Sequence, residues 1–121
     1  MTEFTGFRSE SFQFFADLAQ NNTVEWFDEH QGEYEEFVLE PLHSLVLSLR
    51  EGVDAIRPSL VSDDPDVHLS EMQRGPRTPP GTPPIKTNQY AFFWDQGVRR
   101  LVDGNLFVGL SATGVTIGFS I

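Results

Sequence analysis

The chain has 121 residues, of which 39% are hydrophobic, with 18 acidic residues against 8 Lys and Arg for a net charge of −10, and it contains no cysteine. This length suits a single domain spanning residues 1–121. The missing cysteine excludes disulfides, thiolate metal sites and cysteine nucleophiles, and the acidic charge disfavours nucleic acid and anionic membranes as partners.

The chain carries no signature of export or of membrane insertion. No segment approaches the run of about 18 apolar residues that a membrane span needs. The N-terminus lacks the basic and apolar stretches of a signal peptide. We therefore expect a soluble, cytoplasmic protein. Lys86 is the only lysine. Excess carboxylate with so little lysine also suits a salt-rich cytoplasm, although a GC-rich genome would favour arginine as well.

Residues 1–57 form the expected helical part. A first helix is predicted from Ser9, as its N-cap, to about Gln20, with one apolar face made of Phe12, Phe15, Ala16 and Ala19. Asn22 and Glu25 are spaced as in a capping box and predict the start of the next helix.

The second helical stretch is expected from about residue 24 to residue 52. Its apolar residues keep a period near 3.6, and Pro41 lies inside that pattern. Proline donates no backbone hydrogen bond and crowds the preceding turn, so Pro41 must kink or divide the helix. Gly52 is the predicted C-cap.

Residues 67–121 form the expected sheet part. Alternating residues predict strands at 67–74 and 86–95, and a hairpin that turns at Thr113–Gly114 within 105–121. Between the first two strands, residues 75–84 hold five prolines and two glycines, which predicts an irregular, polyproline-like loop. Helices followed by strands indicate an α+β fold, with N-terminal helices packed on a mostly antiparallel β-sheet.

Several motifs together resemble one known family. The chain reads Phe4-Thr5-Gly6-Phe7, then Phe12 to Leu18, Asn21-Asn22, Glu25-Trp26-Phe27, His30, Tyr34-Glu35 and Pro41-Leu42. This pattern resembles the domain of unknown function 2461 family. A glycine-bearing strand pair at residues 107–119 is also similar to that family.

A second block of the family, rich in arginine, aspartate and lysine, is matched only in part. Arg74, Arg77, Pro84, Lys86 and Thr87 agree with it, whereas the family's aspartates at positions 75 and 81 and its lysines at 80 and 82 are replaced. Members of the family generally continue beyond residue 121, so the chain is short at its C-terminus by that comparison. The resemblance implies a fold and no substrate.

The leading functional hypothesis is a small-anion-binding module that uses Arg74, Arg77, Lys86 and Thr87. Arg74 and Lys86 flank the Pro-rich loop of an otherwise acidic chain and Arg77 lies within it, and arginine forks bind carboxylate or phosphate. The alternative is that these side chains are ion-pair partners of helix carboxylates.

Two other function classes stay open. The Pro-rich loop or the terminal strand would suit a protein-interaction or structural domain. A diverged enzyme would need a general acid–base, for which His30 is the candidate, but no partner for it is evident, and the catalytic residues are unknown. We expect no metal site and no cofactor, because the three histidines are scattered and no nucleotide-binding motif is present.

Overall fold

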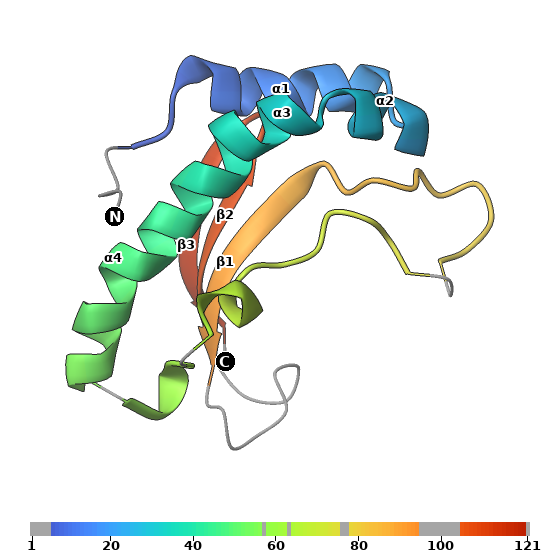
Figure 1. Ribbon diagram of the computed structural model, residues 1–121. Helices are drawn as coiled ribbons and strands as arrows, with labels where there is room; N and C mark the ends of the chain where they lie inside the picture. Colours follow the sequence, from blue (N-terminus) through green and yellow to red (C-terminus); the bar gives the residue numbers. More distant parts are fainter. Residues whose placement is uncertain (1–5, 57, 63, 76–77, 95–104, 121) are drawn as a thin grey trace.

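The computed structural model describes residues 6–56, 58–62, 64–75, 78–94 and 105–120. A helical layer covers one face of an antiparallel sheet (Figure 1). The fold is therefore α+β with helices packed on the sheet, as predicted. The helices are α1 (Ser9–Gln20), α2 (Val24–Glu29), α3 (Gln31–Tyr34), the π-helix η1 (Glu35–Leu39), α4 (Glu40–Ile56) and the 3-10 helices η2 (Pro58–Leu60) and η3 (Pro65–His68). The strands are β1 (Asn88–Trp94), β2 (Asn105–Ser111) and β3 (Gly114–Ser120), in that order across the sheet.

The core lies between the helices and the first two strands. α1 packs over β2 and α4 over β1. The buried apolar side chains come from both layers, including Phe14, Phe15 and Leu18 of α1, Val38 of η1, Leu42 and Val46 of α4, Ala91 and Phe93 of β1, and Leu110 of β2. Burial of this apolar surface is what holds the helical layer on the sheet.

Both predicted helix starts were placed on the wrong residue. The N-cap of α1 is Arg8 instead of Ser9, and its backbone N–H donates to the buried hydroxyl of Ser11 over 3.1 Å. The N-cap of α2 is Thr23, whose hydroxyl accepts from the backbone N–H of Trp26. At α2 the cap is the residue whose hydroxyl reaches a free N–H group of the first turn, and neighbouring polar residues in the sequence are equally suited to that role.

Pro41 neither kinks the chain sharply nor ends the helix. The residues before it form the π-helix η1, in which the N–H of Glu40 donates to the carbonyl of Glu35, five residues back. The wider turn removes the usual demand for a bond at proline, since one residue is inserted into the helical ladder. α4 then continues through Gly52 to Ile56, so the predicted C-cap at Gly52 was wrong.

The strand predicted at 67–74 is also absent. Its first residues belong to η3, and the remainder forms no regular strand but two isolated bridges, Leu69–Ala91 and Gln73–Ile85. The predicted strand at 86–95 is β1. The predicted hairpin is β2–β3, with a loop of Ala112 and Thr113 followed by Gly114 at φ +135°.

Asn22 has a tertiary role in place of the predicted capping role. Its amide nitrogen donates to the carbonyl of Ile85 over 2.7 Å, and its amide oxygen accepts from the N–H of Ile85 over 2.9 Å. Asn22 thus acts as a short piece of backbone that pairs with the chain just before β1. The side chain of Ile85 is fully buried, so this pair fixes a core residue.

His68 ties the segment after η3 to β1. The ring is fully buried, Nδ1 lies 3.0 Å from the carbonyl of Phe92, and Nε2 lies 3.0 Å from the backbone nitrogen of Ser62. The Ser62 N–H can only donate, so Nε2 accepts and Nδ1 carries the proton that is donated to Phe92. Burial lowers the pKa of His68 below its ordinary value, opposed by the bond to Phe92 and reinforced by the positive charge of Arg50.

Asn22→Ala should lower the free energy of unfolding by about 1–3 kcal/mol, because it leaves the N–H and carbonyl of Ile85 without their partner. Chemical denaturation measures this loss. Asn21→Ala is the matched control, since the exposed side chain of Asn21 bonds only the carbonyl of Asp17. Equal losses in the two variants would show that the Asn22–Ile85 pair adds no stability.

The free energy of unfolding should fall as the pH drops below about 6.5, the ordinary pKa of histidine. In that range His68 is protonated in the unfolded chain but stays neutral in the native chain, because its pKa is lowered there. The free energy of unfolding therefore rises with pH, by up to about 1.4 kcal/mol per pH unit for one proton. Denaturation across this pH range in wild type and His68→Gln measures the effect. The variant should be less stable at neutral pH but depend less on pH. An unchanged slope in His68→Gln would contradict the assignment.

Candidate functional site

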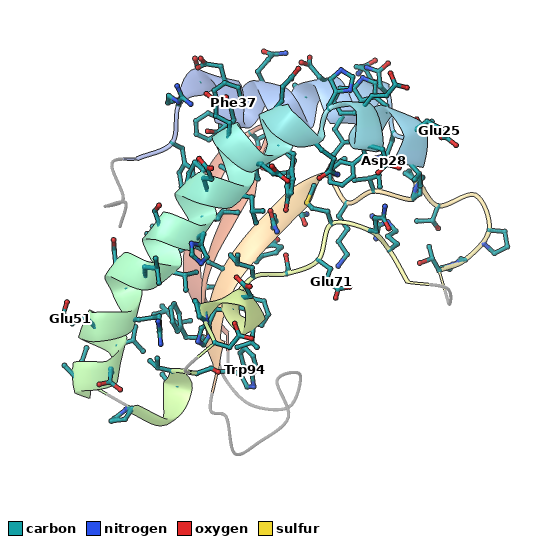
Figure 2. The ribbon with its side chains drawn as sticks, in the orientation of Figure 1. Glu25, Asp28, Phe37, Glu51, Glu71 and Trp94 are labelled. Carbon is teal, nitrogen blue, oxygen red and sulfur yellow. The ribbon has the colours of Figure 1, made fainter. Side chains whose placement is uncertain are left out.

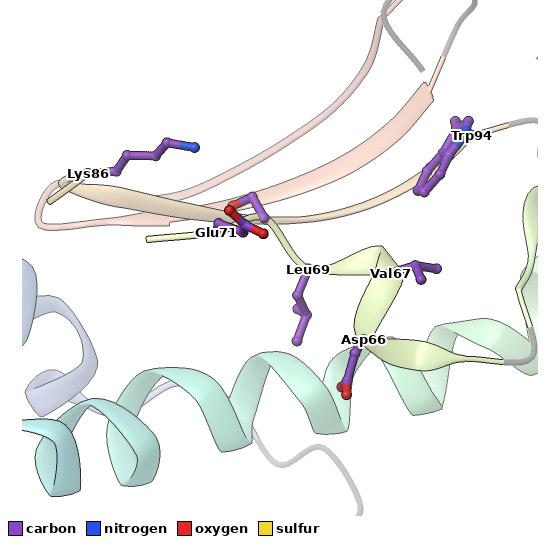
Figure 3. A pocket seen from close by; sticks show the side chains of 7 residues that line it. Asp66, Val67, Leu69, Glu71, Lys86 and Trp94 are labelled. Carbon is purple, nitrogen blue, oxygen red and sulfur yellow. The ribbon is translucent and has the colours of Figure 1, made fainter. Parts of the chain in front are cut away.

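A groove of about 500 Å³ runs beside the outer edge of β1. Figure 3 shows Lys86 and Trp94 at its two ends, with Glu71 between them on the neighbouring segment. The lining residues are Asp66, Val67, Leu69, Ser70, Glu71, Lys86 and Trp94. They come from two segments only, η3 with the chain that follows it, and β1 with the chain that precedes it.

The groove arises where these two segments fail to pair as regular strands. Between the bridges Leu69–Ala91 and Gln73–Ile85, residues 70–72 lie opposite the longer stretch 86–90. Ser70 spans this mismatch with two bonds to Tyr90: its N–H donates to the carbonyl, and its hydroxyl accepts from the N–H, both over 2.9 Å. At the other end, the N–H of Lys86 donates to the carbonyl of Met72 over 2.7 Å. These bonds hold the two segments together at both ends of the mismatch.

Charges of both signs line the groove. Glu71 and Asp66 supply carboxylates, and Lys86 supplies an ammonium group. Asp66 also reaches toward α4, where its Oδ1 lies 3.8 Å from Nε2 of His43. A ligand here would meet a cation at one end and acceptors along one side.

The structure brings together two of the four residues singled out from the sequence. The N–H of Arg74 donates to the carbonyl of Pro84, so Arg74 and Lys86 stand on neighbouring rungs of the same short ladder. Thr87 is exposed next to Lys86 and is not part of the groove lining. Arg77 lies outside the described residues.

Arg74 and Lys86 form no ion pair with the described residues of the helices. Arg74 uses Nε to donate to the carbonyl of Pro83 over 2.9 Å. Among the residues that the structure describes, no carboxylate oxygen lies within 4.0 Å of the charged nitrogens of Arg74 or Lys86. The ion pairs between helices and sheet that the sequence also allowed are therefore not observed for these two residues.

A second hollow of about 390 Å³ lies on the other side of the same segment, toward the helices. Tyr34 and Gln89 line it together with apolar side chains from α2 and η1. The Tyr34 hydroxyl donates to Oε1 of Gln89 over 3.0 Å, and Nε2 of Gln89 donates to the carbonyl of Ser70 over 2.8 Å. Burial raises the pKa of Tyr34, which keeps the hydroxyl protonated as the donor of this chain.

The His30 ring interacts with Trp26 of the preceding helix α2. Its Nδ1 lies 2.7 Å from the carbonyl of Trp26, and its ring stacks on the Trp26 ring at a centroid distance of 3.9 Å. It lines neither hollow. Within the described residues, no group of three or more His, Asp and Glu side chains is placed to hold a metal ion.

Sequence reasoning missed most of the groove. Val67 and Ser70 fall in the strand predicted at 67–74 and Trp94 in the strand predicted at 86–95, and no pattern in the sequence indicated that they would meet. The irregular pairing that brings them together depends on hydrogen bonds between segments about 20 residues apart. No local pattern reports such bonds. In the described part of the chain, no helix is both long enough and apolar enough to cross a membrane.

Comparison with known proteins gives one match. Neither the curated proteins nor the solved structures include a significant relative of this chain. The family model described as conserved hypothetical protein (DUF2461) matches residues 10–121. Because this match covers almost the whole sequence, the chain belongs to the DUF2461 family of conserved hypothetical proteins.

Proposed function

We propose that the protein is a binding module for a small organic anion, held in the groove beside β1. The observation that carries the proposal is Lys86, which lines the groove and has no carboxylate partner among the described residues. An ammonium group in this position attracts a carboxylate or phosphate. Arg74, on the neighbouring rung, adds positive potential at the same end.

The rest of the lining narrows the class of ligand. Val67 and Trp94 offer apolar contact at the far end of the groove, which suits a hydrocarbon or ring portion. As carboxylates, Glu71 and Asp66 can accept hydrogen bonds but donate none, so they favour ligand hydroxyl or ammonium groups and repel a second negative charge. A hydroxy acid or an amino acid meets these demands better than a nucleotide with several phosphates.

The net charge supports a local role for Lys86 and Arg74. The chain as a whole repels anions at −10, so binding depends on these cations at short range. We place the protein in the cytoplasm as part of this proposal, as one domain acting on a small metabolite.

A suitable ligand at about 100 times its dissociation constant should raise the free energy of unfolding by about 2.7 kcal/mol. Thermal unfolding against hydroxy acids, amino acids, inorganic phosphate and nucleotides, at fixed ionic strength, measures this. Lys86→Gln should abolish the stabilisation, Arg74→Gln should weaken it, and Lys86→Arg should retain most of it. Arg8→Gln is the matched control, because it removes the same charge from an exposed position on the helical layer.

Trp94 gives a second readout at the opposite end of the groove. In a Trp26→Phe background Trp94 is the single tryptophan, and a ligand seated beside it should change its fluorescence with the same dissociation constant. Stabilisation that survives Lys86→Gln, or a panel that leaves both wild-type unfolding and Trp94 emission unchanged, would rule out this site.

A protein-interaction role is the second candidate, and the exposed apolar side chains of β3 favour it. Val115 is 43% exposed and Ile117 is 72% exposed, on a strand at the edge of the described sheet. For the Pro-rich loop and for catalysis by His30, the described residues provide no comparable observation.

A further inference from the structure

The outer edge of β3 carries a row of backbone groups that the described sheet does not use. The two-residue loop of the hairpin makes Ser111–Gly114 a hydrogen-bonded pair, and such pairs alternate along an antiparallel ladder. Thr116 and Gly118 therefore bond to β2, whereas Val115, Ile117 and Phe119 direct their N–H and carbonyl groups away from it. A strand is the natural partner for such an edge.

The side chains of Val115 and Ile117 lie on the helix side of the sheet without cover. They pair across the ladder with Leu110 and Val108, which are buried beneath the helices. β3 thus continues the core face beyond the edge of the helical layer. Ile117 is 72% exposed, whereas Val108, its partner across the ladder, is buried.

α1 borders this uncovered strip with an apolar flank. Phe14 faces α2 and α3, where its ring meets those of Trp26, Phe27 and Tyr34. At 100° per residue, Phe12, Ala16 and Ala19 lie on the opposite flank of α1. Because α1 lies over β2, that flank faces the β3 side. Strip and flank together form one apolar surface.

The distribution of charge along the chain favours a second copy of the same chain as the partner of β3. Residues 105–120 contain no Asp, Glu, Lys, Arg or His, in a chain whose net charge is −10. Two copies that met through their acidic surfaces would repel each other, whereas two β3 strands meet without charge. The edge also lacks the lysines, prolines and bulges that usually block strand pairing.

We infer that two copies of this chain pair through β3, antiparallel and about a twofold axis at Ile117. Antiparallel pairing of a strand with itself is symmetric, so the same surface serves both copies. Centring on Ile117 lets the N–H and carbonyl of that residue bond their twofold mates, while Val115 of each copy faces Phe119 of the other. The two sheets become one continuous sheet, and the apolar strips of both copies lie side by side on one face of it and contact each other.

Sedimentation across a wide concentration range tests the pairing. Wild type should approach twice the chain mass of 13.7 kDa. Added salt should shift the equilibrium further toward the dimer, because it screens the charge of the two acidic chains. Ile117→Lys should remain at one chain mass at every concentration. Ala112→Lys, which puts the same charge on the exposed hairpin loop, should still dimerise.

Two measurements make the result specific to β3. Hydrogen exchange of the Val115 and Ile117 amides should slow as the dimer forms, while exchange at exposed Thr113 stays unchanged. Circular dichroism should confirm that Ile117→Lys is folded, since Ile117 contributes little to the core of a single copy. A wild type that stays at one chain mass, or a dimer that persists in Ile117→Lys, would overturn the proposal.

Discussion

β1 forms hydrogen bonds along both of its edges, and these bonds, with those of the residues just before it, connect it to β2, the helical layer and the segment after η3. β2 satisfies one edge with regular pairing from Asn88 to Trp94. No full strand occupies the other edge in the described structure. Separate polar groups form the hydrogen bonds at that edge. Ser70 bonds Tyr90, His68 bonds the carbonyl of Phe92, and Asn22 bonds Ile85 just before the strand. Asn22 belongs to the helical part of the chain, whereas His68 and Ser70 belong to η3 and the segment after it. β1 and the residues just before it are therefore bonded to both parts.

This arrangement explains why a groove exists beside β1. A continuous strand would have brought its side chains up against those of β1 and filled the space. The irregular segment satisfies the backbone but leaves room for a ligand between Lys86 and Trp94. Figure 2 shows where the carboxylates lie: Glu25, Asp28 and Glu51 are exposed on the helical layer, and Glu71 projects from the segment along the groove. Positive charge is concentrated at the end of the groove lined by Lys86, where Arg74 stands on the neighbouring rung of the backbone ladder.

Local patterns in the sequence were sufficient to locate the main helices, although not their ends, and to locate β1 and the hairpin. Apolar periodicity marks the buried faces of α1 and α4, and the Thr113–Gly114 turn is visible from its residues. Three features escaped because competing arrangements share the same local pattern. Pro41 allowed a kink or a break, and the chain adopted a π-helix. Asn22 resembled a cap, yet its partner Ile85 lies 63 residues away. The alternation at 67–74 resembled a strand, although its first residues continue the 3-10 helix that starts at Pro65 and the buried ring of His68 bonds Ser62 and Phe92. Of the groove, sequence reasoning identified Lys86 and the neighbouring Arg74, because cations stand out in an acidic chain, and it missed the residues that only tertiary hydrogen bonds assemble.

The outer face of the sheet carries two pairs of an aromatic ring and a glycine. A β-carbon at Gly109 would lie 2.5 Å from the Tyr90 ring, and one at Gly118 would lie 2.7 Å from the Phe107 ring. Each ring lies over the bare backbone of the neighbouring strand and shields it from water, while the absent side chain is what lets the ring lie flat. The two members of each pair are thus not independent positions. A larger residue at 109 is compatible with this sheet only together with a smaller one at 90, and the same holds for 118 and 107. Along this face, substitutions are accepted or rejected as pairs, so the identity of one residue sets which residues its neighbour across the strand can be.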